Sequence, residues 1–561
     1  MGERGINSPC VTQDRPRRWV VAMVGAVVLA LLPACGSGSG ENGGGSAGDA
    51  GGEPTTLRVA LSVDVGGAQD PHTFTGNFTL LDMVYEPLVI YGEGGVIEPG
   101  LAESFEVSDD GLRVTFRLRD GVTFHDGTPF DAEAVKWNFD RWVGKEDYSF
   151  FRTANVISQV NVVDPATVEL VLTEPYPPLL QELSIVRPVR FLSPASVGPD
   201  ASTASRPSSP APAGGPDGAF AEPVGTGPWR LESSSETGAV LVRYDGYWGE
   251  QSSIDRVEFK VIPDSQTRVS ALRSGEVDLI GGAYLAPVTP VEAQQLESAD
   301  GIKLLVGDPD TTVVVGFNPR GPLADRAVRA AVARTIDRKA LTAALYPGFG
   351  QPADTLFPPS IPDSGEPIGV RFDPDAARAA LDGAGWVVSG DGRAKSGKPL
   401  ELELLVPLSP VHGVQDSRTA AAAVAAALEQ VGIGVTVKAV DEAAYYDEFS
   451  ARSWDLSFVE TYGAPYDPSN SAVSYLTSEG SDSPLWATPE LDGLVDAAVF
   501  AATDAARAAA CQNVFDYLED QAAFVPLTRP SRLWAVGPGV SGFEVPITEY
   551  DMDLRSVTVS R

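Results

Sequence analysis

The sequence predicts an α/β protein, because short runs of alternating apolar and polar residues are interspersed with runs of helical periodicity. With 43% hydrophobic and 21% charged residues, the 561-residue chain has the composition of a globular protein with a sizeable core. At roughly 100–200 residues per domain, this length suggests about three or four folding units.

The individual elements can be predicted from periodicity and capping residues. Residues 57–63 and 114–119 alternate apolar and polar side chains, which is typical of strands. Asp131 is a suitable N-cap for a helix that runs through Trp142. Further helices are expected at 325–335, 373–381, 415–431 and 504–520, with strands at 400–406, 435–440 and 455–459.

The N-terminus is typical of an export signal. Four arginines in residues 1–18 precede a 14-residue apolar run, which would reach about 21 Å and is too short to span a membrane. Leu32-Pro33-Ala34-Cys35 resembles a bacterial lipobox, in which the cysteine is acylated. We therefore expect residues 1–34 to be a signal peptide, Cys35 to carry the lipid, and residues 35–56 to be a flexible Gly/Ser tether. Ordinary secretion with an unmodified Cys35 is the alternative.

Composition excludes several classes of function. The chain has 41 Lys plus Arg against 76 Asp plus Glu, a formal charge of −35, and loss of residues 1–34, which carry +2, changes this to about −37. Such a surface repels nucleic acids and anionic lipid headgroups. No later run is apolar enough to span a membrane. The histidines and cysteines are too few for a zinc ribbon, iron–sulfur cluster or disulfide framework: His72, His125, His412, Cys10, Cys35 and Cys511.

No local motif indicates an enzyme, and no cofactor is expected. Gly225-Thr226-Gly227 is not followed by the lysine and hydroxyl of a phosphate-binding loop. Ser541 lacks the flanking spacing of a nucleophile elbow. His125 lies in a glycine-containing turn, where a role in local hydrogen bonding is more common than catalysis. A catalytic triad needs no local motif, so a secreted hydrolase or glycan-binding lipoprotein stays open as an alternative.

One internal segment has low complexity. Residues 202–223 are rich in Ser, Pro, Ala and Gly. Such a composition buries too little apolar surface to offset the entropy of ordering. We therefore expect a mobile surface loop here.

Eight segments, in order and spacing, resemble the extracytoplasmic solute-binding proteins of ABC importers, in the peptide/nickel family (family 5). The resemblance covers nearly all of residues 57–561. It rests on Met-Val-Tyr-Glu-Pro-Leu at 83–88, Pro-Gly-Leu-Ala-Glu-Ser at 99–104, Leu-Arg-Asp-Gly-Val at 118–122, Phe-His-Asp-Gly-Thr-Pro-Phe at 124–130, Val-Gly-Thr-Gly-Pro-Trp at 224–229, Tyr-Trp-Gly at 247–249, Val-Ile-Pro-Asp at 261–264 and Leu-Arg-Ser-Gly-Glu-Val-Asp at 272–278.

The resemblance implies a two-lobed clamshell of the periplasmic-binding-protein type, with an extra subdomain in the first lobe. The first lobe would comprise residues 57–307 and 532–561, with the extra subdomain at about 100–223, and the second lobe residues 308–531. It further implies a monomer that binds a small molecule without chemistry and delivers it to an ABC permease and its ATPase subunits. Through the lipid, it would be anchored to the outer face of the cytoplasmic membrane.

Two segments bear on the ligand. Tyr462-Gly-Ala-Pro-Tyr-Asp-Pro resembles the nickel-type branch, because peptide-binding members carry an ammonium-binding aspartate where this chain has Pro465. By the same resemblance, Arg187 would hold a carboxylate of a metal-bound organic chelator. The alternative is a salt bridge within the lobe, which Arg190 could equally make. A short-peptide receptor is the second reading of the ligand.

The match to the nickel-type branch is incomplete. No histidine follows His412, although nickel-type members carry a metal-binding histidine further on, and a second chelate-binding arginine expected before Phe150 is missing. We expect Phe150, Tyr462 and Tyr466 to be pocket aromatics and Phe78 to replace a methionine of that pocket. Each could instead pack in a core.

The scarcity of histidine and cysteine also limits how a metal could be bound. A bare late transition metal would need imidazole or thiolate ligands from the protein. We therefore expect no protein metal ligands. Any metal would arrive inside a small carboxylate or opine-like chelator, and the protein would hold the chelator rather than the ion.

Overall fold

The computed structural model describes residues 54–560, except 64, 66–67, 74–76, 199–215, 217, 368, 409–416 and 479–484. The predicted signal peptide, Cys35, most of the tether, His412 and most of the predicted loop at 202–223 lie outside the described residues. The first described strand, β1, begins at Thr56, the last residue assigned to the tether.

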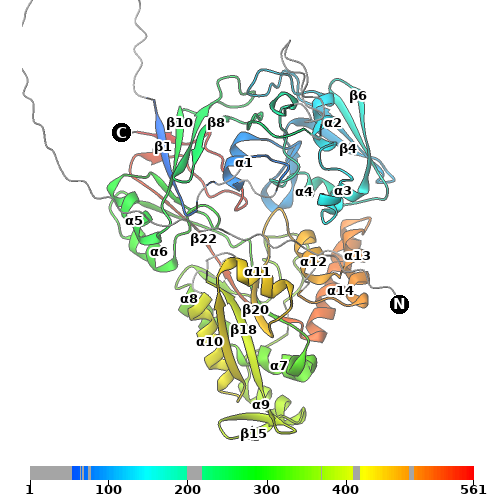
Figure 1. Ribbon diagram of the computed structural model, residues 1–561, viewed down its shortest axis with the longest axis vertical. Helices are drawn as coiled ribbons and strands as arrows, with labels where there is room; N and C mark the ends of the chain where they lie inside the picture. The colour runs from blue at the N-terminus through cyan, green and yellow to red at the C-terminus, as the bar shows by residue number, and fades with distance from the viewer. Residues whose placement is uncertain are drawn as a thin grey trace, which may run out of the picture. The chain divides into compact units, whose positions relative to one another are not determined.

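The first lobe is built on a seven-stranded sheet that includes the C-terminal part of the chain (Figure 1). Its central strand β1 pairs in parallel with both β10 and β11, and it is buried along most of its length, as expected of a strand covered on both faces. The strands in spatial order are β12 (Lys303–Gly307), β22 (Arg532–Val536), β11 (Leu279–Gly281), β1 (Thr56–Leu61), β10 (Arg256–Val261), β9 (Gly238–Arg243) and β8 (Trp229–Ser235).

A four-stranded antiparallel sheet lies within the range of the predicted extra subdomain. Its strands are β4 (Ala102–Val107), β5 (Arg113–Leu118), β7 (Thr167–Leu172) and β6 (Ile157–Asp164), accompanied by helices α2 (Ala132–Phe139), α3 (Arg152–Val156) and α4 (Leu179–Glu182). Asp131 caps α2 as predicted, accepting a hydrogen bond from the Ala134 amide at 3.0 Å. The helix ends at Phe139, so the predicted continuation to Trp142 is wrong. Trp142 instead lies in the turn that follows, where it is fully buried.

The second lobe is built on a six-stranded mixed sheet with helices packed on it (Figure 1). All five residues of β13 are buried, which is typical of a central strand. In spatial order the strands are β14 (Gly350–Pro352), β21 (Phe524–Pro530), β13 (Val313–Phe317), β20 (Leu456–Glu460), β18 (Glu401–Pro407) and β19 (Gly434–Val440). The helices of this lobe include α7 (Arg326–Thr335), α9 (Pro374–Gly383), α10 (Ser417–Glu429), α12 (Ser469–Leu476), α13 (Pro489–Val499) and α14 (Asp504–Gln521).

These elements confirm the predicted α/β class and the predicted helices and strands of the second half of the chain. The chain leaves the first sheet after β12, at Gly307, and enters the second sheet at Val313. It returns between the end of β21 at Pro530 and the start of β22 at Arg532. We propose that these two crossovers divide the lobes at the boundaries given above.

Candidate functional site

A cluster of six aromatic residues lies between the two lobes. Phe78 begins α1 (Phe78–Val84), Tyr284 follows β11, and Tyr550 belongs to the segment after β22, so these three come from the first lobe. The other three follow β20 in the second lobe. The aromatic cluster consists of Phe78, Tyr284, Tyr462, Tyr466, Tyr475 and Tyr550.

Tyr550 lies at the centre of this aromatic cluster. Its ring centroid is 4.9 Å from that of Phe78 and 5.1 Å from that of Tyr284, both in the first lobe. It is also 4.9 Å from the ring of Tyr466 in the second lobe. The Tyr550 hydroxyl donates a hydrogen bond to the backbone carbonyl of Tyr462 at 2.7 Å. Tyr550 is therefore one of the side chains through which the two lobes are in contact.

Arg187 lies against the aromatic cluster. Its guanidinium carbon is 3.8 Å from the ring centroid of Phe78, which is a close cation–π contact. Burial lowers the pKa of Arg187, while the neighbouring phenols of Tyr466 and Tyr550 act in the opposite direction. The cluster thus carries a partly buried positive charge on its first-lobe side.

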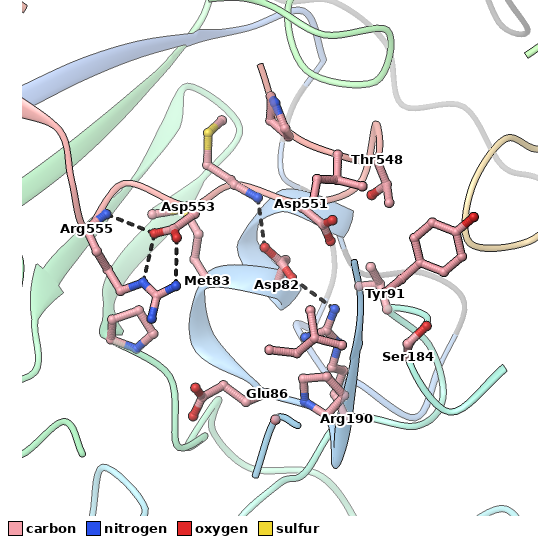
Figure 2. Close-up of a pocket in the computed structure, with 18 of the residues that line it drawn as sticks. Asp82, Met83, Glu86, Tyr91, Ser184, Arg190, Thr548, Asp551, Asp553 and Arg555 are labelled. Atoms are coloured by element: carbon pink, nitrogen blue, oxygen red, sulfur yellow. Dashed lines mark hydrogen bonds and ion pairs between the residues drawn. The ribbon is translucent and has the colours of Figure 1, made fainter. Parts of the chain in front are cut away.

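Arg190, and not Arg187, makes the salt bridge within the first lobe that the sequence suggested as an alternative. One of its nitrogens lies 2.9 Å from a carboxylate oxygen of Asp82 (Figure 2), and its Nε donates to the carbonyl of Ile185 at 3.1 Å. The side chain is 5% exposed, so this is a buried ion pair within the first lobe. The surrounding burial nevertheless raises the pKa of Asp82 to about 7.

The segment that carries Tyr462 and Tyr466 is tightly held. The Asp467 carboxylate accepts a hydrogen bond from the Gly463 amide at 2.9 Å, and Gly463 has a φ of +77°, which favours glycine. From α4 in the first lobe, the Gln181 side-chain amide donates to the carbonyls of Pro465 at 2.6 Å and Asp467 at 2.7 Å. Both tyrosines are therefore positioned by contacts to the opposite lobe.

The structure brings four of the five predicted ligand-binding residues together: Arg187, Phe78, Tyr462 and Tyr466. Phe150 is not a member of the aromatic cluster. It lies in the loop between the 3-10 helix η2 (Glu146–Tyr148) and α3, and it is 52% exposed. The ligand-binding roles of all five residues stay predictions.

A cavity of about 360 Å³ is lined by residues of α1, the segment that carries Arg190 and the C-terminal segment (Figure 2). Val186 and Pro465, the sequence neighbours of Arg187 and Tyr466, form part of its wall. None of the five predicted residues lines it. Two ion pairs lie in its walls: Asp82 with Arg190, as above, and Asp553 with Arg555, whose nitrogens lie 2.9 and 2.7 Å from the carboxylate oxygens.

The motifs that carried the family resemblance form scaffold, as expected. The Glu86 carboxylate accepts hydrogen bonds from Thr226 and Tyr247 at 2.8 Å and from the Trp248 indole at 3.0 Å. It thus joins three of those motifs. Trp229 is fully buried.

His125 lies in a turn as predicted, but its ring bonds to the distant turn at 225–227 and not to its sequence neighbours. Its Nε2 lies 2.9 Å from the carbonyl of Gly227, and its Nδ1 accepts a hydrogen bond from the Gly225 amide at 3.3 Å. The proton of the neutral ring is therefore on Nε2. Burial lowers the pKa of His125 to about 4.

Half of the residues in the aromatic cluster were not predicted from the sequence. Tyr284, Tyr475 and Tyr550 lie in no motif, and their positions depend on how distant parts of the chain meet. Among the described residues, no group of three or more His, Cys, Asp and Glu side chains is arranged to hold a metal ion. In the same part of the chain, no helix has the length and apolar character needed to cross a membrane.

Two α/β lobes joined by two crossovers, with aromatic side chains and a partly buried arginine between them, define a two-lobed solute-binding protein. A family model for bacterial extracellular solute-binding proteins, family 5, matches residues 96–483, more than half of the chain. The chain belongs to this family.

Relatives and solved structures agree with this assignment. The nickel-binding periplasmic protein of Escherichia coli is 32% identical over 489 residues, covering 85% of this chain and 89% of the relative. A putative ABC transporter peptide-binding protein of Brucella ovis is 30% identical over 478 residues, covering 82% and 84%.

Among solved structures, an ABC transporter substrate-binding protein from Sinorhizobium meliloti is 41% identical, with a TM-score of 0.73. NikA from Brucella suis, in complex with Fe(III)-EDTA, is 31% identical, with a TM-score of 0.80. Both matches cover 90% of this chain and all of the solved chain.

Family membership confirms three predictions: the two-lobed fold, the family itself and the absence of enzymatic activity. The chain is an extracytoplasmic receptor that binds a small molecule for an ABC transporter, in which a permease and ATPase subunits are its partners. The alternative of a secreted hydrolase is set aside.

Proposed function

We propose that this receptor captures a small carboxylate-bearing ligand, a metal chelate or an opine-like metallophore, and delivers it to its permease. The observation that carries the proposal is the Arg187 guanidinium, placed on the ring of Phe78 within an aromatic cluster built from both lobes. A ligand bound there would contact both lobes at once and favour their closure.

The chemistry of Arg187 suits a carboxylate. Its planar fork offers two parallel N–H donors to the two oxygens, and a guanidinium keeps its charge when buried. Burial disfavours the charged form of Arg187 and lowers its pKa. A ligand carboxylate beside the guanidinium would offset part of this desolvation cost. The rings of Phe78, Tyr462 and Tyr466 would pack against the less polar faces of the ligand.

A metal would enter within its chelator. With three histidines in the sequence, and no metal-holding group among the described side chains, the protein offers the wrong donors for a bare late transition metal. The relative named as nickel-binding and the structure holding Fe(III)-EDTA, a polycarboxylate chelate, support this class of ligand.

A short peptide is the second candidate, because a relative of similar identity is named as a putative peptide-binding protein. A peptide brings an α-ammonium group, and Pro465 offers no charge where peptide-binding members carry an aspartate. A buried ammonium without a counter-charge costs several kcal/mol. This observation favours the chelate.

The mode of attachment is also a proposal. Acylation of Cys35 would anchor the receptor to the outer face of the cytoplasmic membrane, with residues 35–56 as the tether. We propose that the receptor acts as a monomer, since one chain supplies both lobes of the site.

Native mass spectrometry of the full chain, purified gently from its own host, tests the ligand class. We expect a bound mass that shows the isotope pattern of nickel or cobalt together with an organic remainder. A series of peptide masses would favour the second candidate. If the protein is empty, titration with Ni(II)-EDTA and with short peptides decides between the two.

A further inference from the structure

Four buried carboxylic acids gather where the lobes join. Asp310 lies in the crossover between β12 and β13, Glu460 ends β20, Asp467 precedes α12, and Glu549 lies in the C-terminal segment of the first lobe. These crossover carboxylates are 6%, 5%, 0% and 9% exposed, respectively. Burial raises the pKa of the Tyr284 phenol, and the charges of Glu460, Asp310 and Glu549 raise it further. These three acids therefore lie close to the aromatic cluster.

Three of the crossover carboxylates accept hydrogen bonds. Glu460 accepts from the Thr311 hydroxyl at 2.6 Å, and Glu549 accepts from the Ala283 amide at 2.7 Å. Asp467 accepts from Gly463, as described above, and from the Ser471 hydroxyl.

Asp310 differs from the other three. Its Oδ2 is buried and has no hydrogen-bond partner in the described part of the chain. The same oxygen lies so close to Gly463 that a Cβ added there would be 3.2 Å from it. An ionised carboxylate oxygen in such a place would lack the hydrogen bonds that stabilise its charge.

The positive charge available to the four acids is small. The Arg532 Nε lies 3.9 Å from a Glu549 oxygen, while the same side chain donates to the carbonyls of Asp308, Pro546 and Ile547. The phenols of Tyr91, Tyr284 and Tyr550 also face the acids, and Asp551, in the same segment as Glu549, shares the charge of Arg532. Because the charges of Glu549 and Asp467 act on the buried Asp310, these acids cannot all ionise.

The electrostatic consequences agree with this geometry. Burial, together with the charge of Glu549, raises the pKa of Asp310 to about 8. Burial likewise raises the pKa of Glu460 to about 8 and that of Asp467 to about 7. Burial also raises the pKa of Glu549, against the opposing effect of Arg532.

We propose that closure of the lobes takes up a proton, which Asp310 and the neighbouring crossover carboxylates hold. Glu549 belongs to the first lobe, whereas Glu460 and Asp467 belong to the second, so opening separates like charges and admits water. The acids then ionise near their ordinary pKa. This inference rests on the proposed function only in that a ligand closes the lobes.

The sign of the effect follows from linkage. Because the closed form holds a proton that the open form has lost, closure is most favourable at pH values below the ordinary carboxyl pKa. It weakens as the pH rises towards about 8, the raised pKa of Asp310 and Glu460. With one proton taken up, ligand affinity falls about tenfold for each pH unit between about pH 5 and pH 7.

Calorimetric titration of the full-length protein with Ni(II)-EDTA, whose charge is constant over this range, tests the proposal. Repeating the titration in buffers of different ionisation heat counts the protons taken up. We expect about one proton for the unmodified protein, and a flattened pH dependence for both Asp310→Asn and Glu549→Gln. Glu429→Gln, an exposed acid on α10, is the control and should behave like the unmodified protein. An unchanged slope in both crossover variants would overturn the proposal.

A second measurement needs no ligand. In hydrogen–deuterium exchange of the ligand-free, full-length protein, the Ala283 and Thr461 amides report on the junction, since they bond to Glu549 and to the Thr312 carbonyl. After correction for the intrinsic effect of pH, we expect faster exchange at about pH 8 than at about pH 6, and no such difference in Asp310→Asn. Equal exchange at both pH values in the unmodified protein would overturn the proposal, whereas failure of Ni(II)-EDTA to bind at any pH would count against the proposed ligand class alone.

Discussion

Arg187 and Arg190 lie three residues apart, yet the structure gives them different surroundings. Arg190 is paired with Asp82 inside the first lobe, and Arg187 stacks on Phe78 at the aromatic cluster. The family resemblance pointed to Arg187 as the ligand-binding residue, and the fold shows which of the two arginines makes the internal salt bridge. Their substitutions should therefore affect different properties of the protein.

Replacing Arg187 should weaken ligand binding with little change in stability. Arg187→Ala removes the fork that we assign to the ligand carboxylate, and we expect a loss of roughly 2–5 kcal/mol. Arg187→Lys should recover only part of this, since a point charge cannot reproduce two parallel hydrogen bonds. Calorimetry with the native ligand measures the effect. A loss below about 0.5 kcal/mol, far under the range for a buried charged contact, would remove Arg187 from the site.

Replacing Arg190 should reduce stability instead. Arg190→Leu leaves Asp82 buried without its counter-charge, and we expect the free energy of unfolding to fall by about 3–5 kcal/mol near neutral pH and above. The pKa of Asp82 is raised to about 7. Below this pH the side chain becomes protonated, so the loss of unfolding free energy should be smaller. Denaturant unfolding at two pH values measures it. The double variant with Asp82→Asn should be less affected than Arg190→Leu, and the opposite order would refute the assignment.

At the scale of elements, the packing of α1 depends on a glycine in a distant turn. A Cβ added to Gly225 would lie 2.0 Å from the carbonyl oxygen of Val84, the last residue of α1. The helix that presents Phe78 can therefore approach this turn only because residue 225 lacks a side chain. This gives a physical reason for one of the glycine-containing motifs noted in the sequence.

Gly225→Ala should therefore destabilise the first lobe. Overpacking of this kind costs about 1–3 kcal/mol. Gly493→Ala is the matched control: it lies within α13, where a Cβ would meet no atom within 4 Å, and alanine favours the helix by about 1 kcal/mol. Thermal unfolding should show a lower midpoint for the first variant and an equal or higher one for the second. Equal midpoints for Gly225→Ala and the unmodified protein would contradict the packing argument.

Local elements were the most predictable part of this chain. Asp325 and Asp373, predicted as the first residues of two helices, are the N-caps of α7 and α9, so both predicted starts are within one residue of the observed ones. The predicted helix through Trp142 fails for a tertiary reason: the indole turns into the core beside Phe139. The helical spacing of the apolar residues gave no sign of that turn.

At the scale of the whole molecule, the distribution of buried acids should make stability depend on pH. The raised pKa values of Asp82, Asp310, Glu460 and Asp467 mean that their contribution is fully present below the ordinary carboxyl pKa and is lost as the pH rises through about 7–8. His125 acts oppositely: its pKa is lowered to about 4, so its contribution is lost as the pH falls below its ordinary value of about 6.5. Above about pH 7 only the acids remain, and stability should decline.

Scanning calorimetry from about pH 7 to pH 9 should therefore show a falling unfolding temperature. Glu460→Gln should reduce the slope, because an amide does not ionise. The exposed Glu429→Gln should leave it unchanged. A flat profile for the unmodified protein would show that these acids are ionised, or matched by positive charge, in the folded state.

The ligand site could be predicted only in part, and the reason is topological. Arg187 and Tyr466 lie in segments with a recognisable family pattern, whereas Tyr550 lies in none. Tyr550 reaches the centre of the aromatic cluster because the chain returns to the first lobe after β21. The crossover carboxylates could not be predicted from the sequence either. Among 76 acidic residues, nothing in the sequence distinguishes these four from the rest.

The return of the chain also sets the order in which the molecule can be completed. β22 is inserted between β11 and β12, which are synthesised more than two hundred residues earlier. Until residue 532 emerges, those two strands present open edges that can pair with other chains. The lobe that is made first is therefore finished last. A chain cut short before β22 would lack a strand from the interior of its largest sheet, and not merely a tail.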